Sequence, residues 1–225
     1  PTKRHLPYYQ MFHECEERMR HPLRPWMVLL PLLMGGCGTQ APQMYGDGFP
    51  VAKPMDLVHV GATVEARFVL PPPWEKDPKP RTFLIGFRTG GPAKRPDMRP
   101  GDVDFLEDAR IPLKVQLWKL DGGTEMPIAL HALNRDLPAV WQGSRYQPAK
   151  GDVFEYRNAV GADSNSLANA GKYDTSLAYR EYEVARADSG DLTAGKYRLK
   201  VTNLQDNAEV AHLNIELLVA NYNGK

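Results

Sequence analysis

The feature that most restricts the fold of this chain is the alternation of apolar and polar residues in its middle part. The clearest run lies between residues 58 and 70, where the apolar side chains share one parity: Val58, Val60, Ala62, Val64, Ala66, Phe68 and Leu70. The pattern recurs at residues 83–87 and 111–117. A period of two residues is typical of a β-strand that buries one face, and it argues against an amphipathic helix in these segments.

Four further segments extend the pattern: residues 125–133, 176–187, 196–203 and 210–219. About seven strands with one apolar face each predict two antiparallel sheets packed against each other. We therefore expect an all-β fold, an antiparallel two-sheet β-sandwich of the immunoglobulin-like or Greek-key type. The predicted core residues are Phe68, Ile85, Val115, Leu117, Leu199, Val201, Leu213 and Ile215.

Two local motifs agree with a sandwich. Residues 121–123 (Asp-Gly-Gly) are typical of a tight turn between strands. Residues 192–197 lead into a predicted strand and resemble the tyrosine corner of Greek-key sandwiches. In that motif Tyr197 would bond its hydroxyl to the backbone a few residues upstream, and the alternative is a tyrosine that only packs within its strand.

Long loops interrupt the strand pattern at three places. Residues 71–80 contain five prolines, residues 90–108 end in an acidic stretch, and residues 134–175 form the longest interruption. We interpret residues 134–175 as an insertion in the sandwich. A connection of that length is typical of a functional or partly disordered segment.

The N-terminal part has the layout of a secretory signal. Basic residues after Met19 precede an apolar run that begins at Trp26 and ends in Gly35, Gly36 and Cys37. A cysteine at the cleavage point resembles a lipobox, in which a thiolate takes up the lipid of a bacterial lipoprotein. The alternative is a buried apolar helix with a chance cysteine, and the run is shorter than the roughly 20 residues of a membrane-spanning helix.

The position of the cleavage point predicts the organisation of the chain. Residues 1–18 are an upstream or non-native extension, residues 19–36 a lipoprotein signal peptide, and residues 37–48 a lipidated tether. Residues 49–225 are the β-sandwich domain. Because Gly38 follows the cysteine in place of an aspartate, the sequence resembles lipoproteins sorted to the outer membrane, and we expect the domain to face the periplasm.

Charge and cysteine content narrow the partners and the chemistry. The chain has a net charge of +1, and its acidic and basic residues stay nearly balanced when residues 1–36 are removed. A nucleic-acid partner is therefore not expected. Cys15 lies outside the exported part and Cys37 would carry the lipid, so the domain would have neither a disulfide nor a cysteine-based catalytic or metal site.

Tryptophans are the candidate binding residues. Trp74 and Trp141 lie in predicted loops, and Trp118 lies on the strand face opposite the predicted core. Each could anchor a partner protein, because tryptophan is enriched among residues that carry binding energy. The alternative for Trp74 and Trp141 is that the rings fold back onto the sandwich, and for Trp118 that the insertion covers it.

The acidic loop and the histidines are weaker candidates for metal binding. Four carboxylates lie close together in sequence and are weak calcium candidates, with a solvated loop as the alternative: Asp102, Asp104, Glu107 and Asp108. His59, His131 and His212 are expected on strands, with His59 and His212 on the solvent face. We predict neither a metal ion nor a cofactor.

Several segments resemble a known family: residues 49–51 (FPV), 61–68 (GATVEARF), 111–115 (IPLKV), 120–123 (LDGG) and 192–199 (LTAGKYRL). They are similar to proteobacterial lipoproteins with a domain of unknown function 5625, which are common in Burkholderia-type genomes. The resemblance covers most of residues 49–219. It implies a lipid-anchored β-sandwich and brings no catalytic residues with it.

Together these observations favour a binding module without catalytic activity, anchored in the cell envelope by a lipid and engaging a protein partner. One concrete version is an immunity lipoprotein that neutralises a toxin. The alternatives are a structural or assembly lipoprotein of the envelope or of a secretion apparatus, and a carbohydrate-binding or hydrolase domain. The sequence leaves the oligomeric state open.

Overall fold

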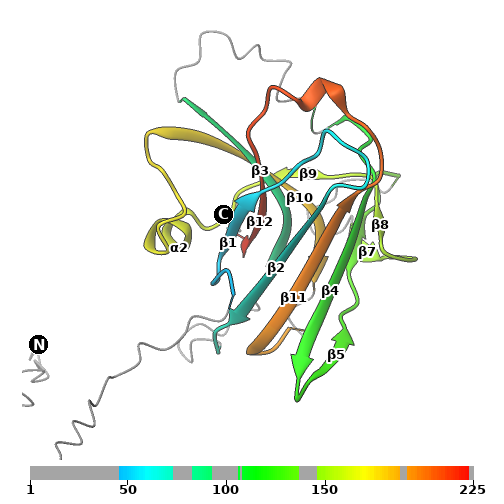
Figure 1. The fold of residues 1–225 in the computed structure, drawn as a ribbon, viewed down its shortest axis with the longest axis vertical. Helices are drawn as coiled ribbons and strands as arrows, with labels where there is room; N and C mark the ends of the chain where they lie inside the picture. The colour runs from blue at the N-terminus through cyan, green and yellow to red at the C-terminus, as the bar shows by residue number, and fades with distance from the viewer. Residues whose placement is uncertain are drawn as a thin grey trace, which may run out of the picture. The chain divides into compact units, whose positions relative to one another are not determined.

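The computed structural model describes residues 46–72, 83–92, 106, 108–136, 146–187 and 192–222. Two antiparallel sheets pack against each other, which confirms the predicted all-β sandwich (Figure 1). One sheet has the strand order β1 (Val51–Pro54), β12 (Ile215–Asn221), β3 (Phe83–Pro92), β10 (Leu177–Ala187), β6 (His131–Leu133) and β7 (Tyr146–Pro148). β9 (Asn158–Val160) also pairs with β10, so we call this the seven-stranded sheet.

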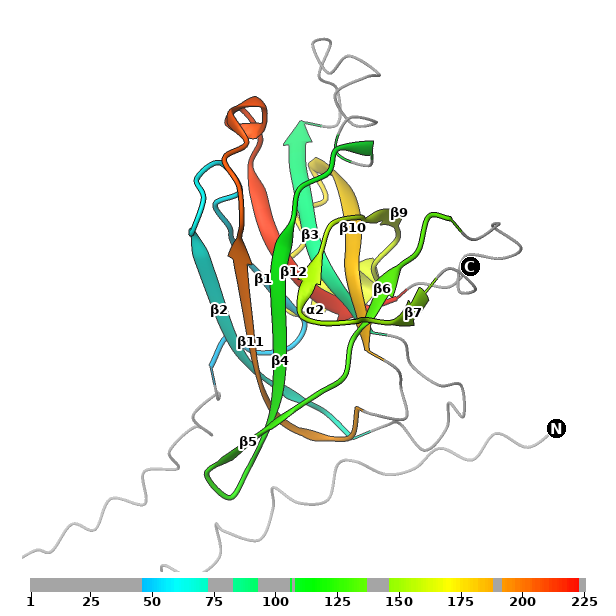
Figure 2. The ribbon, with the colours of Figure 1, turned by 90° about the vertical axis from the view of Figure 1, so that its right-hand side faces the viewer.

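The second sheet has five strands. Its order is β2 (Thr63–Leu70), β11 (Gly195–Asn203), β4 (Leu113–Asp121) and β5 (Thr124–Pro127), and β8 (Val153–Phe154) pairs with β4. Figure 2 shows the two layers from the side. One short α-helix, α2 (Ser164–Asn169), and the 3₁₀ turn η2 (Ala208–Val210) complete the described elements.

The core lies between the sheets and agrees with the predicted alternation. Seven of the eight predicted core residues are buried, and Leu213 is half-buried and packs against them. The predicted tyrosine corner is confirmed. The Tyr197 hydroxyl donates to the Thr193 carbonyl over 2.8 Å and accepts from the Thr193 N–H over 3.1 Å. Its ring stacks on Phe68 at 5.8 Å between centroids.

Three predicted strands have different limits in the structure. The run from residue 58 becomes a strand only at Thr63, because residues 58–61 turn, with Gly61 in the left-handed region at φ +80°. Val60 is consequently 56% exposed. The prediction for residues 210–219 is also wrong at its start, since β12 begins at Ile215 after η2. Residues 125–133 split into β5 and β6, which belong to different sheets.

The histidine prediction needs a related correction. His59 and His212 lie in turns rather than on strands, because both precede the points at which β2 and β12 begin. His131 does lie on a strand, β6.

The outer face of the seven-stranded sheet is covered rather than solvated. Residues 162–173, which we call the α2 segment, cross this face, and Figure 1 shows α2 on the side of β12 away from β2 and β11. A second apolar cluster forms there from Leu84, Ala162, Leu167, Leu218 and Ala220. Within the predicted insertion 134–175, the described residues therefore contribute β7, β8, β9 and α2 to the packed domain.

The α2 segment also buries the charged side chain of Arg88, which the apolar–polar alternation of the sequence predicts to be exposed to solvent. Arg88, on the parity opposite the core, is only 2% exposed. Its Nε donates to Glu216 over 2.8 Å, and its Nη2 donates to the Lys172 carbonyl over 2.7 Å. Its guanidinium carbon lies 4.2 Å from the centroid of the Tyr179 ring.

Candidate functional site

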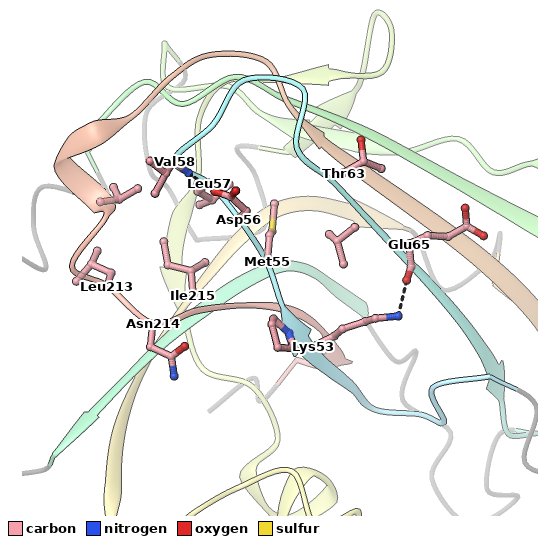
Figure 3. A pocket seen from close by; sticks show the side chains of 13 residues that line it. Lys53, Met55, Asp56, Leu57, Val58, Thr63, Glu65, Leu213, Asn214 and Ile215 are labelled. Atoms are coloured by element: carbon pink, nitrogen blue, oxygen red, sulfur yellow. Dashed lines mark hydrogen bonds between the residues drawn. The ribbon is translucent and has the colours of Figure 1, made fainter.

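A groove of about 630 Å³ opens at one edge of the sandwich, between the edge strands β1 and β2. Figure 3 shows the side chains that line it. Its apolar floor consists of Met55, Leu57, Val64, Val210 and Ile215. Its rim is polar and consists of Lys53, Asp56, Thr63, Glu65 and Asn214. An apolar floor with a few polar groups around it is typical of binding sites, which commonly measure about 300–1,000 Å³.

The wall after β1 is fixed by two buried asparagines. Asn203 Nδ2 donates to the carbonyls of Leu57, over 2.8 Å, and His59, over 2.9 Å. Asn207 Nδ2 also donates to the Leu57 carbonyl, over 2.7 Å. Both asparagines are fully buried. These bonds satisfy the carbonyls of Leu57 and His59, which a neighbouring β-strand would otherwise have to pair. The chain is therefore held in a turn here, and β2 does not extend toward residue 58.

Lys53 closes the other end of the groove. Its Nζ donates to the Glu65 carbonyl over 2.8 Å and to Asp47 Oδ1 over 3.1 Å. Asp47 itself lies against the edge of β2: its N–H donates to the Arg67 carbonyl over 2.7 Å, and its Oδ2 accepts from the Arg67 N–H over 3.0 Å. Part of the β2 edge is therefore capped by nearby groups of the same domain.

Ion pairs set the electrostatics of the rim. Asp56 Oδ2 lies 2.8 Å from His59 Nδ1, and this hydrogen bond lowers the pKa of Asp56 and raises the pKa of His59. On the opposite rim, hydrogen bonds from Arg198 lower the pKa of Glu65. Both carboxyl groups are therefore ionised at neutral pH, and each already has a cationic or hydrogen-bonding partner.

Trp118 does not lie at the groove. It is half-buried on the outer face of the five-stranded sheet, where the guanidinium carbon of Arg198 lies 5.1 Å from the ring centroid. Arg198 is held in turn by Glu65 and by Glu125, the latter at 2.9 Å. Trp118 therefore packs against an arginine that two carboxylates hold in place. These contacts do not test whether Trp118 also binds a partner protein.

The other predicted site residues fall mostly outside the described part of the chain. That applies to Cys37, Trp74 and Trp141, and to three of the four acidic residues, Asp102, Asp104 and Glu107. The fourth, Asp108, is exposed and lies 3.3 Å from Arg135. Among the residues that the structure describes, no three histidine, cysteine or acidic side chains are grouped as metal ligands. No helix within the described ranges is long and apolar enough to cross a membrane.

The groove was missed by sequence reasoning, although its edge carries a recognisable signal. Lysine and proline are the residues with which natural proteins blunt exposed edge strands, and Lys53-Pro54 ends β1. That pair could have marked β1 as an edge strand. The sequence does not reveal that β1 faces β2 across the sandwich, because residues from η2 and β12 complete the groove.

No protein-family model matches the chain, and no curated protein matches it. A protein from Sulfurospirillum deleyianum, known from a crystal structure, is similar over 78% of this chain and 98% of its own, at 11% sequence identity and a TM-score of 0.38.

Proposed function

We propose that this chain is a binding module without catalytic activity, anchored in the bacterial cell envelope through a lipid on Cys37, and that it holds a partner protein in the groove between β1 and β2. The groove carries the proposal. Its apolar floor and polar rim offer a partner both buried contact area and directional bonds. Its walls are fixed by Asn203 and Asn207, so little order has to be gained on binding.

The lipid anchor is proposed from the sequence pattern around Cys37. The structure describes the chain from Gly46, nine residues later, and Asp47 is bonded to β2. Nine residues span at most about 30 Å when fully extended. A domain on such a short tether would act close to the membrane, so its partner would be a membrane-associated or periplasmic protein.

A site-specific photo-cross-linker tests the groove. Placed at Asn214, on the exposed rim, it should form adducts with a partner protein in cells of the source organism. The matched control is Thr124, which is also exposed but is the first residue of β5, just after the β4–β5 turn at the far end of the five-stranded sheet in Figure 1. Adducts from Thr124 and none from Asn214 would contradict binding in the groove.

The anchor is tested separately. The Cys37→Ser protein should leave the detergent phase, because it can no longer accept a lipid. A Cys37→Ser protein that partitions like the unaltered chain would contradict the anchor and would leave the groove experiment unaffected.

A further inference from the structure

The outward edge of β2 carries free backbone groups over a short run. β2 pairs with β11, and the N–H and carbonyl of Arg67 bond to Asp47 on the side away from β11. Because backbone groups alternate in direction along an antiparallel ladder, those of Thr63 and Glu65 also point away from β11. Lys53 Nζ takes the Glu65 carbonyl. The contacts of the described residues leave three groups of this edge free: the Thr63 N–H, the Thr63 carbonyl and the Glu65 N–H.

The domain itself limits this run at both ends. At one end Asp47 already fills the place of a neighbouring strand beside Arg67. At the other end the chain turns, with Gly61 in the left-handed region, and the Gly61 N–H donates to the Asn203 carbonyl over 2.8 Å. An added segment can therefore pair with β2 only along residues 63–65, all of which line the groove.

The faces of an added segment follow from β2 and are the same for both strand directions. In an antiparallel segment, the residue opposite Thr63 takes both groups of Thr63. In a parallel segment, the residue opposite Val64 donates to the Thr63 carbonyl and accepts from the Glu65 N–H. In both cases the residue opposite Val64 points to the same face as Val64, and its two neighbours point to the other face.

We propose that the groove recognises a short extended motif of the partner protein, in which one aliphatic residue stands between two polar residues. This inference rests on the proposed function and names the chemistry of the partner. Val64 is buried, so the residue opposite it projects onto the apolar floor, where Met55 and Ile215 lie. Its neighbours lie opposite Thr63, which is exposed, and Glu65, which is half-buried, and they face solvent. This pattern reads the same in both directions.

The charge at the Lys53 end of the groove suits an extended backbone. A lysine ammonium has three donors, and Lys53 uses two of them, on Asp47 and on the Glu65 carbonyl. Figure 3 shows Lys53 reaching across the groove toward Glu65. A backbone carbonyl of the partner, where the motif leaves β2 at this end, can accept from the third donor.

A random heptapeptide library displayed on phage, selected on the 225-residue chain, supplies the probe. Enriched peptides should share an aliphatic residue between two polar ones. In fluorescence anisotropy of synthetic copies, N-methylation should weaken binding about tenfold at one of two adjacent positions, because it removes the N–H that reaches the Thr63 carbonyl. That position is the aliphatic residue in a parallel segment and the residue after it in an antiparallel one.

Matched variants test the role of the Glu65 N–H. E65A and E65P both lose the ion pair with Arg198, but only E65P loses the N–H, which points away from β11. E65P should bind the selected peptides about tenfold more weakly than E65A. V69A and V69P are the control and should bind equally, because Val69 has the same parity on β2 but lies outside the groove.

Near-ultraviolet circular dichroism checks that each variant keeps the fold, and the N-methylated peptides test the same pairing if E65P does not fold. Four results would overturn the inference. They are a selection that enriches no shared pattern, full binding after N-methylation at both positions, equal binding by folded E65A and E65P, or a loss for V69P as large as that for E65P.

The proposed function fails by a different experiment. If Asn214 captures a partner whose capture is the same for E65A and E65P, the groove binds a protein by another geometry. If Asn214 captures nothing while Thr124 does, the groove is not the binding site.

Discussion

Leu167 holds the α2 segment against the outer face of the seven-stranded sheet, and its replacement by alanine has a calculable cost. The side chain is fully buried in the second apolar cluster, beside Leu84 and Leu218. A buried leucine-to-alanine change costs about 2–5 kcal/mol, since both transfer free energy and contacts around the cavity are lost. We expect the upper half of that range, because Leu84 and Leu218 lie on paired strands and cannot collapse into the cavity.

The loss should appear first as local opening. α2 is only six residues long, and the Lys172 N–H bonds to the Leu167 carbonyl over 2.8 Å. Lys172 Nζ then reaches the carbonyls of Asp47 and Pro50, at 2.6 and 2.7 Å. When Leu167 is truncated, hydrogen exchange at the Lys172 amide should accelerate, while amides in β11 keep their protection until the whole domain unfolds.

Urea unfolding and hydrogen exchange measure the two effects. The matched control is L204A, the same chemical change at a leucine that is 38% exposed, which should stay within about 0.5 kcal/mol of the unaltered chain. A loss below about 1 kcal/mol for L167A would refute the reasoning. So would equal acceleration of exchange in β11 and at Lys172, because the α2 segment would then not open on its own.

The remaining predictions concern the corner, the edge and pH. Y197F should lower the free energy of unfolding by about 1–2 kcal/mol in urea titrations, because both backbone groups of Thr193 lose their partner. K53M should promote concentration-dependent self-association in sedimentation velocity by uncapping the β2 edge, and K200M, on the central strand β11, should not. E65Q should be less stable than the unaltered chain at pH 7. This difference should persist at pH 5 and vanish only as the pH falls well below 4.5, because the folded-state pKa of Glu65 is lowered. A difference that grows on acidification would contradict the sign.

The predictable part of the fold is the part encoded locally. The alternation in β2, β4 and β11 gave the core correctly, because one face of each of these strands meets the opposing sheet. The tyrosine corner was predictable for the same reason, since Tyr197 bonds to a residue only four positions away. In these elements the local pattern and the tertiary contacts agree.

The unpredictable part depends on contacts between distant segments. The alternation of β3 places Arg88 on the face away from the core, as for a surface residue. Arg88 is nevertheless buried, because the α2 segment, which follows more than 70 residues later in the chain, packs over it. The turn at residues 58–61 is a similar case. Its apolar alternation favours a strand, but bonds from Asn203 and Asn207 to the carbonyls of Leu57 and His59 satisfy the backbone in another way.

Asp47 connects the candidate site with both of these features. Its carboxylate accepts from Lys53, which closes the groove, and from the Arg67 N–H on the β2 edge. Its carbonyl accepts from Lys172, at the end of the α2 segment. The entry of the chain into the domain is therefore bonded to the groove on one side and to the covering segment on the other. Because the bonds from Arg67 and Lys172 join segments that are distant in sequence, the groove takes its shape from the assembled sandwich and not from β1 alone.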